Sequence, residues 1–320
     1  MSITLTEGPD TGAIWHYGDP MAEQRLLESG RGAVRLDHRD VLSIAGPDRL
    51  TWLHDLTTQH LAQLPTGTGT TAFLLSPQGH IEHVLYLVDD GETVWAHTEP
   101  GRGQALADFL QRMIFMRQVE VRLRDELAVV WQPGEPPTGR ITRQAPDSLG
   151  GYESFIPRDH LAGYLESSGA EPVGLWAYEA RRIAAGVPRI FLDTDQRTIP
   201  NELGLADAVH LEKGCYRGQE TVARVHTLGR PPRRLVRLHL DGSMDALPTP
   251  GAELTGADGG RAIGFVGGSA RHHELGPIAL ALVKRNVAVD APLVVEGIAA
   301  AQEPLVDPEV GLHVRALRTN

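Results

Sequence analysis

Apolar positions in the first half of the chain follow both strand and helix spacing. Residues 33–46 predict two short strands around a charged turn, and Pro47 can begin a helix that we expect to end near Leu61. Three strands joined by tight turns are predicted over 70–98, followed by a helix over 103–115. Antiparallel strands mixed with helices in this way indicate an α+β fold.

The pattern changes twice further along the chain. A stretch rich in proline and glycine, 133–151, predicts a surface loop, and two helices are expected over 158–169 and 172–186. Beyond about residue 236, short apolar runs recur between glycine turns, which is typical of a small all-β barrel or sandwich. These runs are RLVRLHLDG, GAELTG, GRAIGFVGG, PIALALVKRN, APLVVEG and HVRALR. We therefore predict a domain boundary within 228–232.

Composition narrows the class of protein. The 320 residues, 41% hydrophobic and 22% charged, are those of an ordinary globular chain with two or three domains. The single cysteine can form no internal disulfide and the first residues lack the features of a secretory signal, so we expect a cytoplasmic protein. No window approaches the roughly 18 consecutive apolar residues of a membrane span. The net charge of −11 argues against direct, sequence-independent nucleic-acid binding.

The segment KGCYRGQETVAR, which begins at Lys213, contains the only cysteine and one of only two lysines. If residues 213–216 are extended, Lys213 and Cys215 share one face and the ammonium favours the thiolate. A helix is predicted from Gly218 to Gly229, and its N-terminus would lower the thiol pKa further. The alternative is a buried thiol that packs as a small hydrophobe. The residue types leave both interpretations open.

The segment KGCYRGQE (213–220) resembles the signature of the YgfZ family, folate-binding proteins linked to iron–sulfur cluster maintenance. ARRIAAGVPRI, TIPNELGL and LSIAGPDRLTWLHDLTTQ are similar to other segments of that family, so the resemblance covers roughly residues 33–318. The wider superfamily includes the T-protein of the glycine cleavage system, an aminomethyltransferase that uses tetrahydrofolate. The resemblance implies a three-domain cloverleaf, with two α+β domains and a C-terminal β-barrel around a central folate cavity.

The resemblance also implies where the domains lie. A split N-terminal α+β domain would take residues 1–47 and 125–228 and hold the KGCYRGQE signature. An inserted α+β domain would take 48–124, and the barrel domain would take 229–320. The last border agrees with the boundary predicted from the apolar pattern.

Two departures from the T-protein concern its folate site. Glu82 and His83 stand where the T-protein has paired aspartates, and a glutamate that it places at the pterin is missing from 181–186. Pterin recognition needs an acceptor for ring N–H groups, and one-carbon transfer needs a group that manages protons at the folate nitrogens. The departures argue against ordinary aminomethyl transfer and leave open whether the chain is an enzyme.

The resemblance implies that Lys213 and Cys215 form the functional centre. Tetrahydrofolate or a derivative would be bound by Glu82, His83, Tyr152, Arg182, Tyr216, Gln219, Glu220 and Arg224. Alternatives remain, because Glu82 and His83 could lie on the polar face of an amphipathic strand and Tyr152 could be a packing residue. Arg224 is expected to pair with Glu220, one helical turn earlier. No metal site is expected, since alternating side chains of one strand cannot bring three ligands together.

The first functional hypothesis is a folate-binding accessory protein that supports assembly or repair of iron–sulfur enzymes. Its partners would be iron–sulfur clients or assembly proteins. One alternative is a tetrahydrofolate-dependent one-carbon transferase or demethylase, which the missing carboxylates weaken. Another is a non-catalytic partner of tRNA-modifying enzymes. Arginines at 230, 233, 234 and 237 could bind the glutamate tail of a folate, or a phosphate of RNA, by charge-assisted hydrogen bonds, although a solvated linker is the simpler interpretation.

Overall fold

The structure is a computed structural model that describes residues 2–204 and 207–310. The chain forms two compact units. Unit 1 comprises Met1–Leu74, His83–Tyr178 and Asp207–Tyr216, and unit 2 comprises Leu75–Glu82, Glu179–Ala206 and Arg217–Asn320. The predicted three-domain division, with borders at 47, 124 and 228, stays a prediction. The predicted strand run HVRALR lies outside the described residues.

The first sheet of unit 1 is the predicted meander joined by two further strands. Its order is β5-β6-β7-β4-β8, and the strand pairs β4–β7, β4–β8 and β6–β7 are antiparallel. The strands are β4 (Asp40–Ala45), β5 (Gly69–Leu75), β6 (Ile81–Asp89), β7 (Thr93–Thr98) and β8 (Glu120–Leu123). The tip of the β5–β6 hairpin belongs to unit 2.

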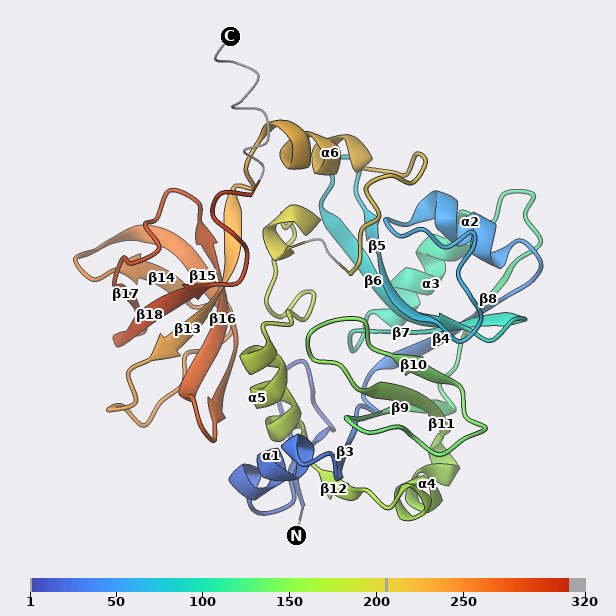
Figure 1. Cartoon of the computed structure of the whole chain (residues 1–320), viewed down its shortest axis with the longest axis horizontal. Coiled ribbons are helices and arrows are strands. Elements are labelled where there is room, and N and C mark those ends of the chain that lie inside the picture. Colours follow the sequence, from blue (N-terminus) through green and yellow to red (C-terminus); the bar gives the residue numbers. More distant parts are fainter. Residues whose placement is uncertain (1, 205–206, 311–320) are drawn as a thin grey trace. The chain divides into compact units, whose positions relative to one another are not determined.

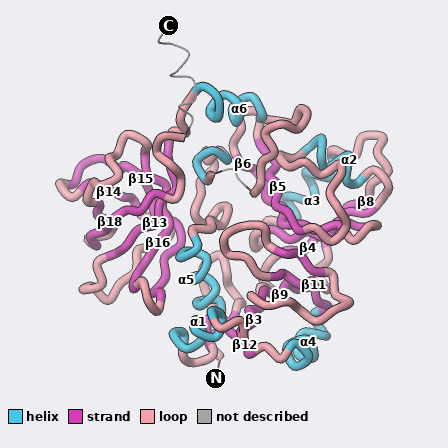
Figure 2. Tube along the Cα trace, viewed as in Figure 1, coloured by secondary structure: helices cyan, strands magenta, loops and turns pink. Residues whose placement is uncertain are grey.

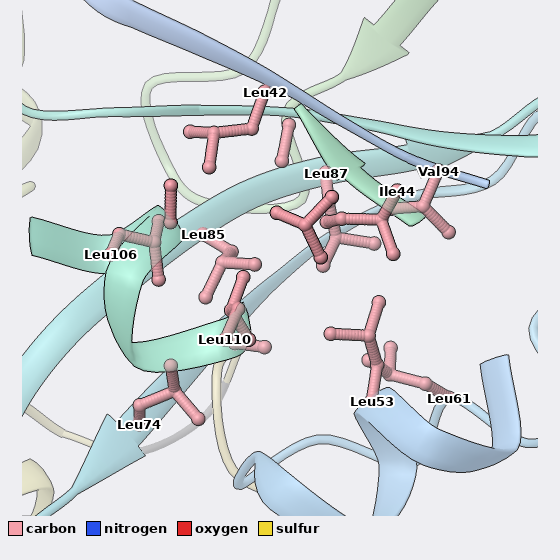
Figure 3. Close-up of a cluster of buried hydrophobic side chains, with 14 of the residues drawn as sticks. Leu42, Ile44, Leu53, Leu61, Leu74, Leu85, Leu87, Val94, Leu106 and Leu110 are labelled. Atoms are coloured by element: carbon pink, nitrogen blue, oxygen red, sulfur yellow. The ribbon is translucent and has the colours of Figure 1, made fainter. Parts of the chain in front are cut away.

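Helices α2 (Arg49–Leu56) and α3 (Gly103–Arg112) pack their apolar stripes on this sheet. Leu53 of α2 and Leu106 and Leu110 of α3 share one buried cluster with strand residues such as Leu42 and Ile44 (Figure 3). Full burial of one such side chain stabilises the fold by about 1.5–3 kcal/mol. The cluster therefore fixes α2, whose C-terminal end bonds to Lys213.

The second sheet of unit 1 has the order β10-β11-β9-β3-β12, and only β12 runs parallel to its neighbour. Its strands are β3 (Gly32–Arg35), β9 (Leu127–Gln132), β10 (Thr142–Gln144), β11 (Tyr152–Pro157) and β12 (Glu171–Val173). Unit 1 also contains β1 (Ile3–Thr4), β2 (Ile14–His16), α1 (Pro20–Glu28), a 3-10 turn (Arg158–His160) and α4 (Leu161–Ser168). Helix α5 (Leu175–Ala185) continues from unit 1 into unit 2.

Unit 2 is built on a closed barrel of order β13-β16-β15-β14-β17-β18, drawn in orange to red in Figure 1 and as magenta strands in Figure 2. The strands are β13 (Arg233–Leu240), β14 (Glu253–Gly256), β15 (Gly259–His272), β16 (Gly276–Lys284), β17 (Leu293–Val295) and β18 (Ile298–Pro304). A 3-10 turn (Pro200–Leu203) and α6 (Gln219–Leu228) complete the unit. The predicted C-terminal barrel is confirmed.

Several predicted elements differ from the structure. The helix expected over 172–186 begins at Leu175, after strand β12, and the one expected over 158–169 divides into a 3-10 turn and α4. Helix α2 ends at Leu56 rather than near Leu61, because Thr57 adopts an extended backbone with φ −107° and ψ 168°. Helix α3 ends at Arg112, and the expected loop over 133–151 contains strand β10. Within the described part of the chain, no helix combines the length and apolar character that crossing a membrane requires.

Candidate functional site

The residues from Lys213 to Tyr216 belong to unit 1 and adopt no regular secondary structure. Lys213 is buried, and its Nζ donates short hydrogen bonds to the backbone carbonyls of His54 and Thr57. The same Nζ lies 4.9 Å from the ring centroid of Tyr216, which is a cation–π distance. Lys213 thus ties the signature segment to the end of α2.

The C-terminal end of α2 explains why a lysine serves at position 213. The last carbonyls of a helix lack intrahelical partners and carry a partial negative charge. An ammonium is a compact donor with three hydrogens, whereas a guanidinium is a planar fork that does not fit two carbonyls one turn apart equally well. Burial lowers the pKa of Lys213 to about 8, while the nearby Asp55 carboxylate acts in the opposite direction.

Cys215 lies two residues beyond this anchor, and its side chain is exposed. Its exposure excludes the alternative in which it packs as a buried hydrophobe. Residues 213–216 do not form a strand, and the two side chains differ in exposure, so the condition for a shared face is not met. The backbone of the segment is therefore anchored on one side by Lys213 while the thiol is presented to solvent.

A cluster of three histidines, which sequence reasoning missed, surrounds the same end of α2. The ring of His60 lies 4.7 Å from that of His54 and 5.3 Å from that of His210. His54 Nδ1 accepts hydrogen bonds from the backbone N–H groups of Leu61 and Ala62 at 3.2 and 3.3 Å. Burial, followed by the charge of Lys213, lowers the pKa of His54. Through these hydrogen bonds His54 helps to position the chain after α2.

Tyr216 closes the anchored segment. It is half-buried, and burial raises the pKa of its hydroxyl to about 12. The chain then enters unit 2 at Arg217 and turns at Gly218, whose φ is +82°. A Cβ at Gly218 would lie 2.4 Å from the carbonyl oxygen of Ser76, so only glycine permits this close approach. The signature glycine thus packs on the turn of the β5–β6 hairpin within unit 2.

Gln219 and Glu220 form the first turn of α6. Glu220 accepts a hydrogen bond from Arg224 at 2.7 Å, which confirms the predicted i,i+4 pair. Both side chains are exposed, and such pairs add only about 0.3–0.5 kcal/mol to stability. The pair contributes little to the stability of the fold, and the contact of Arg224 with folate stays a prediction.

Glu82, in unit 2, forms an ion pair with Arg217 of the signature at 3.1 Å, and both side chains are more than a third exposed. His83, the next residue, belongs to unit 1, where its ring lies 5.5 Å from that of Phe109. Tyr152 is half-buried at the start of β11. The link between Glu82 and the signature was not visible in the sequence, because the two residues are 135 positions apart.

Arg182 is buried in α5 and is held by carboxylates of unit 2. Its Nη1 donates to Asp193 and its Nε to Glu179, both at 2.8 Å. Although burial opposes the charge, these carboxylates raise the pKa of Arg182. Asp193 also accepts from the backbone N–H of Gly268 at 2.6 Å. Arg182 therefore forms a latch to the barrel, and its predicted contact with folate stays a prediction.

The arginines that follow α6 also have partners of their own. Arg233 binds Asp195 at 2.7 Å and Glu202 at 2.8 Å, and Arg237 pairs with Glu303. Arg230 pairs with Glu309, and Arg234 donates to Gln302. These bonds within unit 2 give the arginine run a structural role, and a grip on a folate tail stays a prediction.

A second group that sequence reasoning missed is a buried ionic network in unit 1. Glu153 accepts from Arg143 by a short hydrogen bond and lies 3.0 Å from His97 Nε2. Burial lowers the pKa of His97, whereas the charges of Arg143 and His97 outweigh burial and lower the pKa of Glu153. Because His97 is on β7 and Glu153 is on β11, the network joins the two sheets of unit 1.

The fold is that of glycine cleavage aminomethyltransferase T. The crystal structure of that protein from Bartonella henselae matches with a TM-score of 0.79 and 20% identity, over 95% of this chain and 93% of its own. The predicted fold, with mixed α+β sheets and a C-terminal barrel, is confirmed by this match.

The sequence itself is similar to three kinds of protein. A putative transferase (chloroplastic) of Arabidopsis thaliana is 24% identical, over 87% of this chain and 72% of the relative. An iron–sulfur cluster assembly factor IBA57 homolog (mitochondrial) of Neosartorya fischeri is 26% identical, over 91% of this chain and 78% of the relative. The protein of the same name from Aspergillus clavatus is 27% identical, over 83% and 73%. An aminomethyltransferase of Nitrosococcus oceani is 25% identical, over 59% of this chain and 60% of its own length. No family model matches the chain.

Proposed function

We propose that this chain is a folate-binding accessory protein of the YgfZ type that supports assembly or repair of iron–sulfur enzymes in the cytoplasm. Its partners would be iron–sulfur clients or assembly proteins. The likeness to proteins named as iron–sulfur cluster assembly factors supports the proposal, because it extends over 91% and 83% of this chain. The likeness to the aminomethyltransferase named above covers 59% of it.

The contrast between Lys213 and Cys215 carries the proposal. Lys213 is buried and bonded to the carbonyls that end α2, whereas Cys215 is exposed two residues later. The anchor fixes the backbone from which the thiol projects. Thiolate sulfur is the ligand that iron–sulfur clusters use, and an exposed thiol can reach the iron site of another protein. In this account Lys213 is a positioning residue and Cys215 is the reacting one.

The residue types present also fit a folate. The half-exposed Glu82 carboxylate can accept N–H groups of a pterin, and the exposed guanidinium of Arg224 can bind a carboxylate of the glutamate tail. Tyr152, in unit 1, has a half-buried ring, and its contact with folate stays a prediction. A bound tetrahydrofolate would supply a carrier for one-carbon groups, and the residues of this chain would bind and orient it.

Two measurements test the proposal, one of enzyme activity in cells and one of tetrahydrofolate binding. In cells that lack their own copy of the gene, the chain should restore the activity of iron–sulfur enzymes and leave enzymes without clusters unchanged. Calorimetric titration with tetrahydrofolate should give saturable binding that weakens in Glu82→Gln. The accessory function is wrong if wild-type chain leaves iron–sulfur enzyme activity at the level of the deletion. Absence of heat with millimolar tetrahydrofolate would remove folate from the account.

A further inference from the structure

The turn between α3 and β8 presents large apolar side chains to solvent. Phe115 is 82% exposed and Met116 88% exposed, and Met113 before them is 41% exposed. The other exposed large apolar side chains of the described residues are 41–46% exposed, so Phe115 and Met116 stand out as an adjacent and almost fully exposed pair. Exposed apolar patches commonly mark interaction sites. We call Met113 to Met116 the apolar turn.

The base of the apolar turn is fixed at both ends. Trp52 Nε1 donates to the carbonyl of Met113 at 3.0 Å, and Ile114 packs against the core cluster of the first sheet. On the other side, Asp48 accepts from the backbone N–H of Gln118 at 2.8 Å. The exposed side chains are therefore held on a pinned backbone, which is how a binding surface limits the ordering entropy of association.

Backbone strain at the tip supports the same interpretation. Met116 has a φ of +54°, in the left-handed region that glycine and asparagine adopt far more readily than a long side chain. Such conformations persist where the surrounding structure imposes them, and they cluster at binding and switch segments. Met116 thus combines a left-handed backbone conformation with a side chain that is 88% exposed.

The apolar turn and the exposed thiol are tied to the same helix. Arg117, directly after the turn, pairs with Asp55 of α2 at 3.1 Å. Trp52, which holds the turn, lies on α2, and Thr57, whose carbonyl binds Lys213, is the residue that caps its C-terminal end five positions later, about 8 Å along the helix axis. A partner seated on the apolar turn would therefore be held near the segment that carries Cys215.

We infer that the apolar turn is the docking site for the iron–sulfur client or assembly protein that Cys215 serves, an inference that rests on the proposed function. The partner would offer an apolar pocket for Phe115 and Met116, because buried aromatic anchors dominate binding at protein interfaces. The exposed guanidiniums of Arg112 and Arg117 flank the turn on a chain of net charge −11. The pocket would accordingly be bordered by carboxylates.

A pair of double variants tests the docking site in cells that lack their own copy of the gene. F115S/M116S removes the two most exposed side chains of the turn. M244S/V289S is the matched control, because these barrel residues are 45% and 44% exposed. Iron–sulfur enzyme activity should fall at least about tenfold with the first variant, as after loss of a binding hot spot, and stay near the wild-type level with the second. A benzophenone amino acid at position 115 should crosslink to an iron–sulfur or assembly protein.

Each other result overturns the docking site. If the wild-type chain restores iron–sulfur enzyme activity and F115S/M116S restores it equally well, the docking site is wrong but the proposed function stands. Inactive wild-type chain would instead remove the proposed function. Flotation of the wild type, and not of the variant, with phosphatidylglycerol vesicles would assign the turn to a membrane. Crosslinking to a second copy of the chain alone would assign it to self-association. If the double variant loses its cooperative melting transition, F115N replaces it in the same assay, and its full activity would again contradict docking.

Discussion

Replacing Lys213 by methionine should destabilise unit 1 and release the segment that carries the thiol. Methionine keeps the length of the side chain but removes the donors that serve the carbonyls of His54 and Thr57. The bond to Thr57 is buried, and a buried carbonyl left without a partner costs about 1–3 kcal/mol. The part-buried His54 carbonyl adds less, because water can replace part of its lost bond. Methionine also removes the desolvation of the ammonium, which offsets part of the loss.

The net loss is about 2 kcal/mol, which corresponds to a fall in melting temperature of about 4–8 °C for a unit of this size. Lys284→Met is the matched control, because the only other lysine is exposed and makes one hydrogen bond, to the carbonyl of Ala262 at 2.7 Å. Its effect should stay within about 0.5 kcal/mol. Thermal and urea unfolding measure both changes. Lys213→Arg keeps the charge, so it separates the need for a compact ammonium from the need for a cation.

The effect of the same variants on the Cys215 thiol can be measured by its rate of chemical modification. Because Cys215 is the only cysteine, a thiol-specific reagent reports on it alone. The rate of modification should change in Lys213→Met and stay constant in Lys284→Met, since only the first loses the anchor. Equal melting temperatures and equal modification rates for the two variants would refute the anchoring argument.

Other predictions concern the remaining contacts. Gly267→Ala places a Cβ 2.2 Å from Asp193 Oδ1 and should lower the free energy of unfolding in urea by about 1–3 kcal/mol. Gly256→Ala is the control, because a Cβ at Gly256 meets no described atom within 4 Å. An equally large loss in Gly256→Ala would contradict the latch between Arg182 and the barrel. Acidification should lower the free energy of unfolding. The pKa values of His97 and Glu153 are lowered in the folded chain, so the unfolded chain binds more protons than the folded chain as the pH falls through their usual values of 6.5 and 4.5. Unfolding free energies should therefore decrease from pH 7.5 to pH 4, with a smaller decrease in His97→Phe; a rise in stability on acidification would be incompatible with the network. Arg224→Ala should alter stability by at most about 0.5 kcal/mol but weaken tetrahydrofolate binding in calorimetry, and unchanged affinity would remove Arg224 from the ligand site.

The sequence predicted those parts of the fold that depend on local pattern. The meander over 70–98 and the glycine-spaced strands of the barrel follow from period-two apolar runs and turn residues, and the structure contains both. The end of α2 did not follow, because Leu61 continues the apolar stripe. The helix stops at Leu56, where its last carbonyls bind Lys213, a residue more than 150 positions away.

The candidate site likewise has one part that local spacing predicts and other parts that depend on contacts between distant segments. The Glu220–Arg224 pair lies within one helix and could be predicted from spacing alone. The exposure of Cys215 could not, because it depends on how residues 213–216 pack against α2. The His97–Glu153–Arg143 network likewise joins strands of two sheets, and single-sequence patterns carry no information on such pairings.

The role of Cys215 is tested most directly by the activity of iron–sulfur enzymes in cells that lack their own copy of the gene and carry Cys215→Ser. Serine preserves the size of the side chain and, at an exposed position, should leave the melting temperature unchanged. With equal amounts of protein, the account predicts that wild-type chain restores this activity and that Cys215→Ser leaves it near the level of the deletion. Restoration by Cys215→Ser to the wild-type level would contradict the claim that the exposed thiol is the functional group.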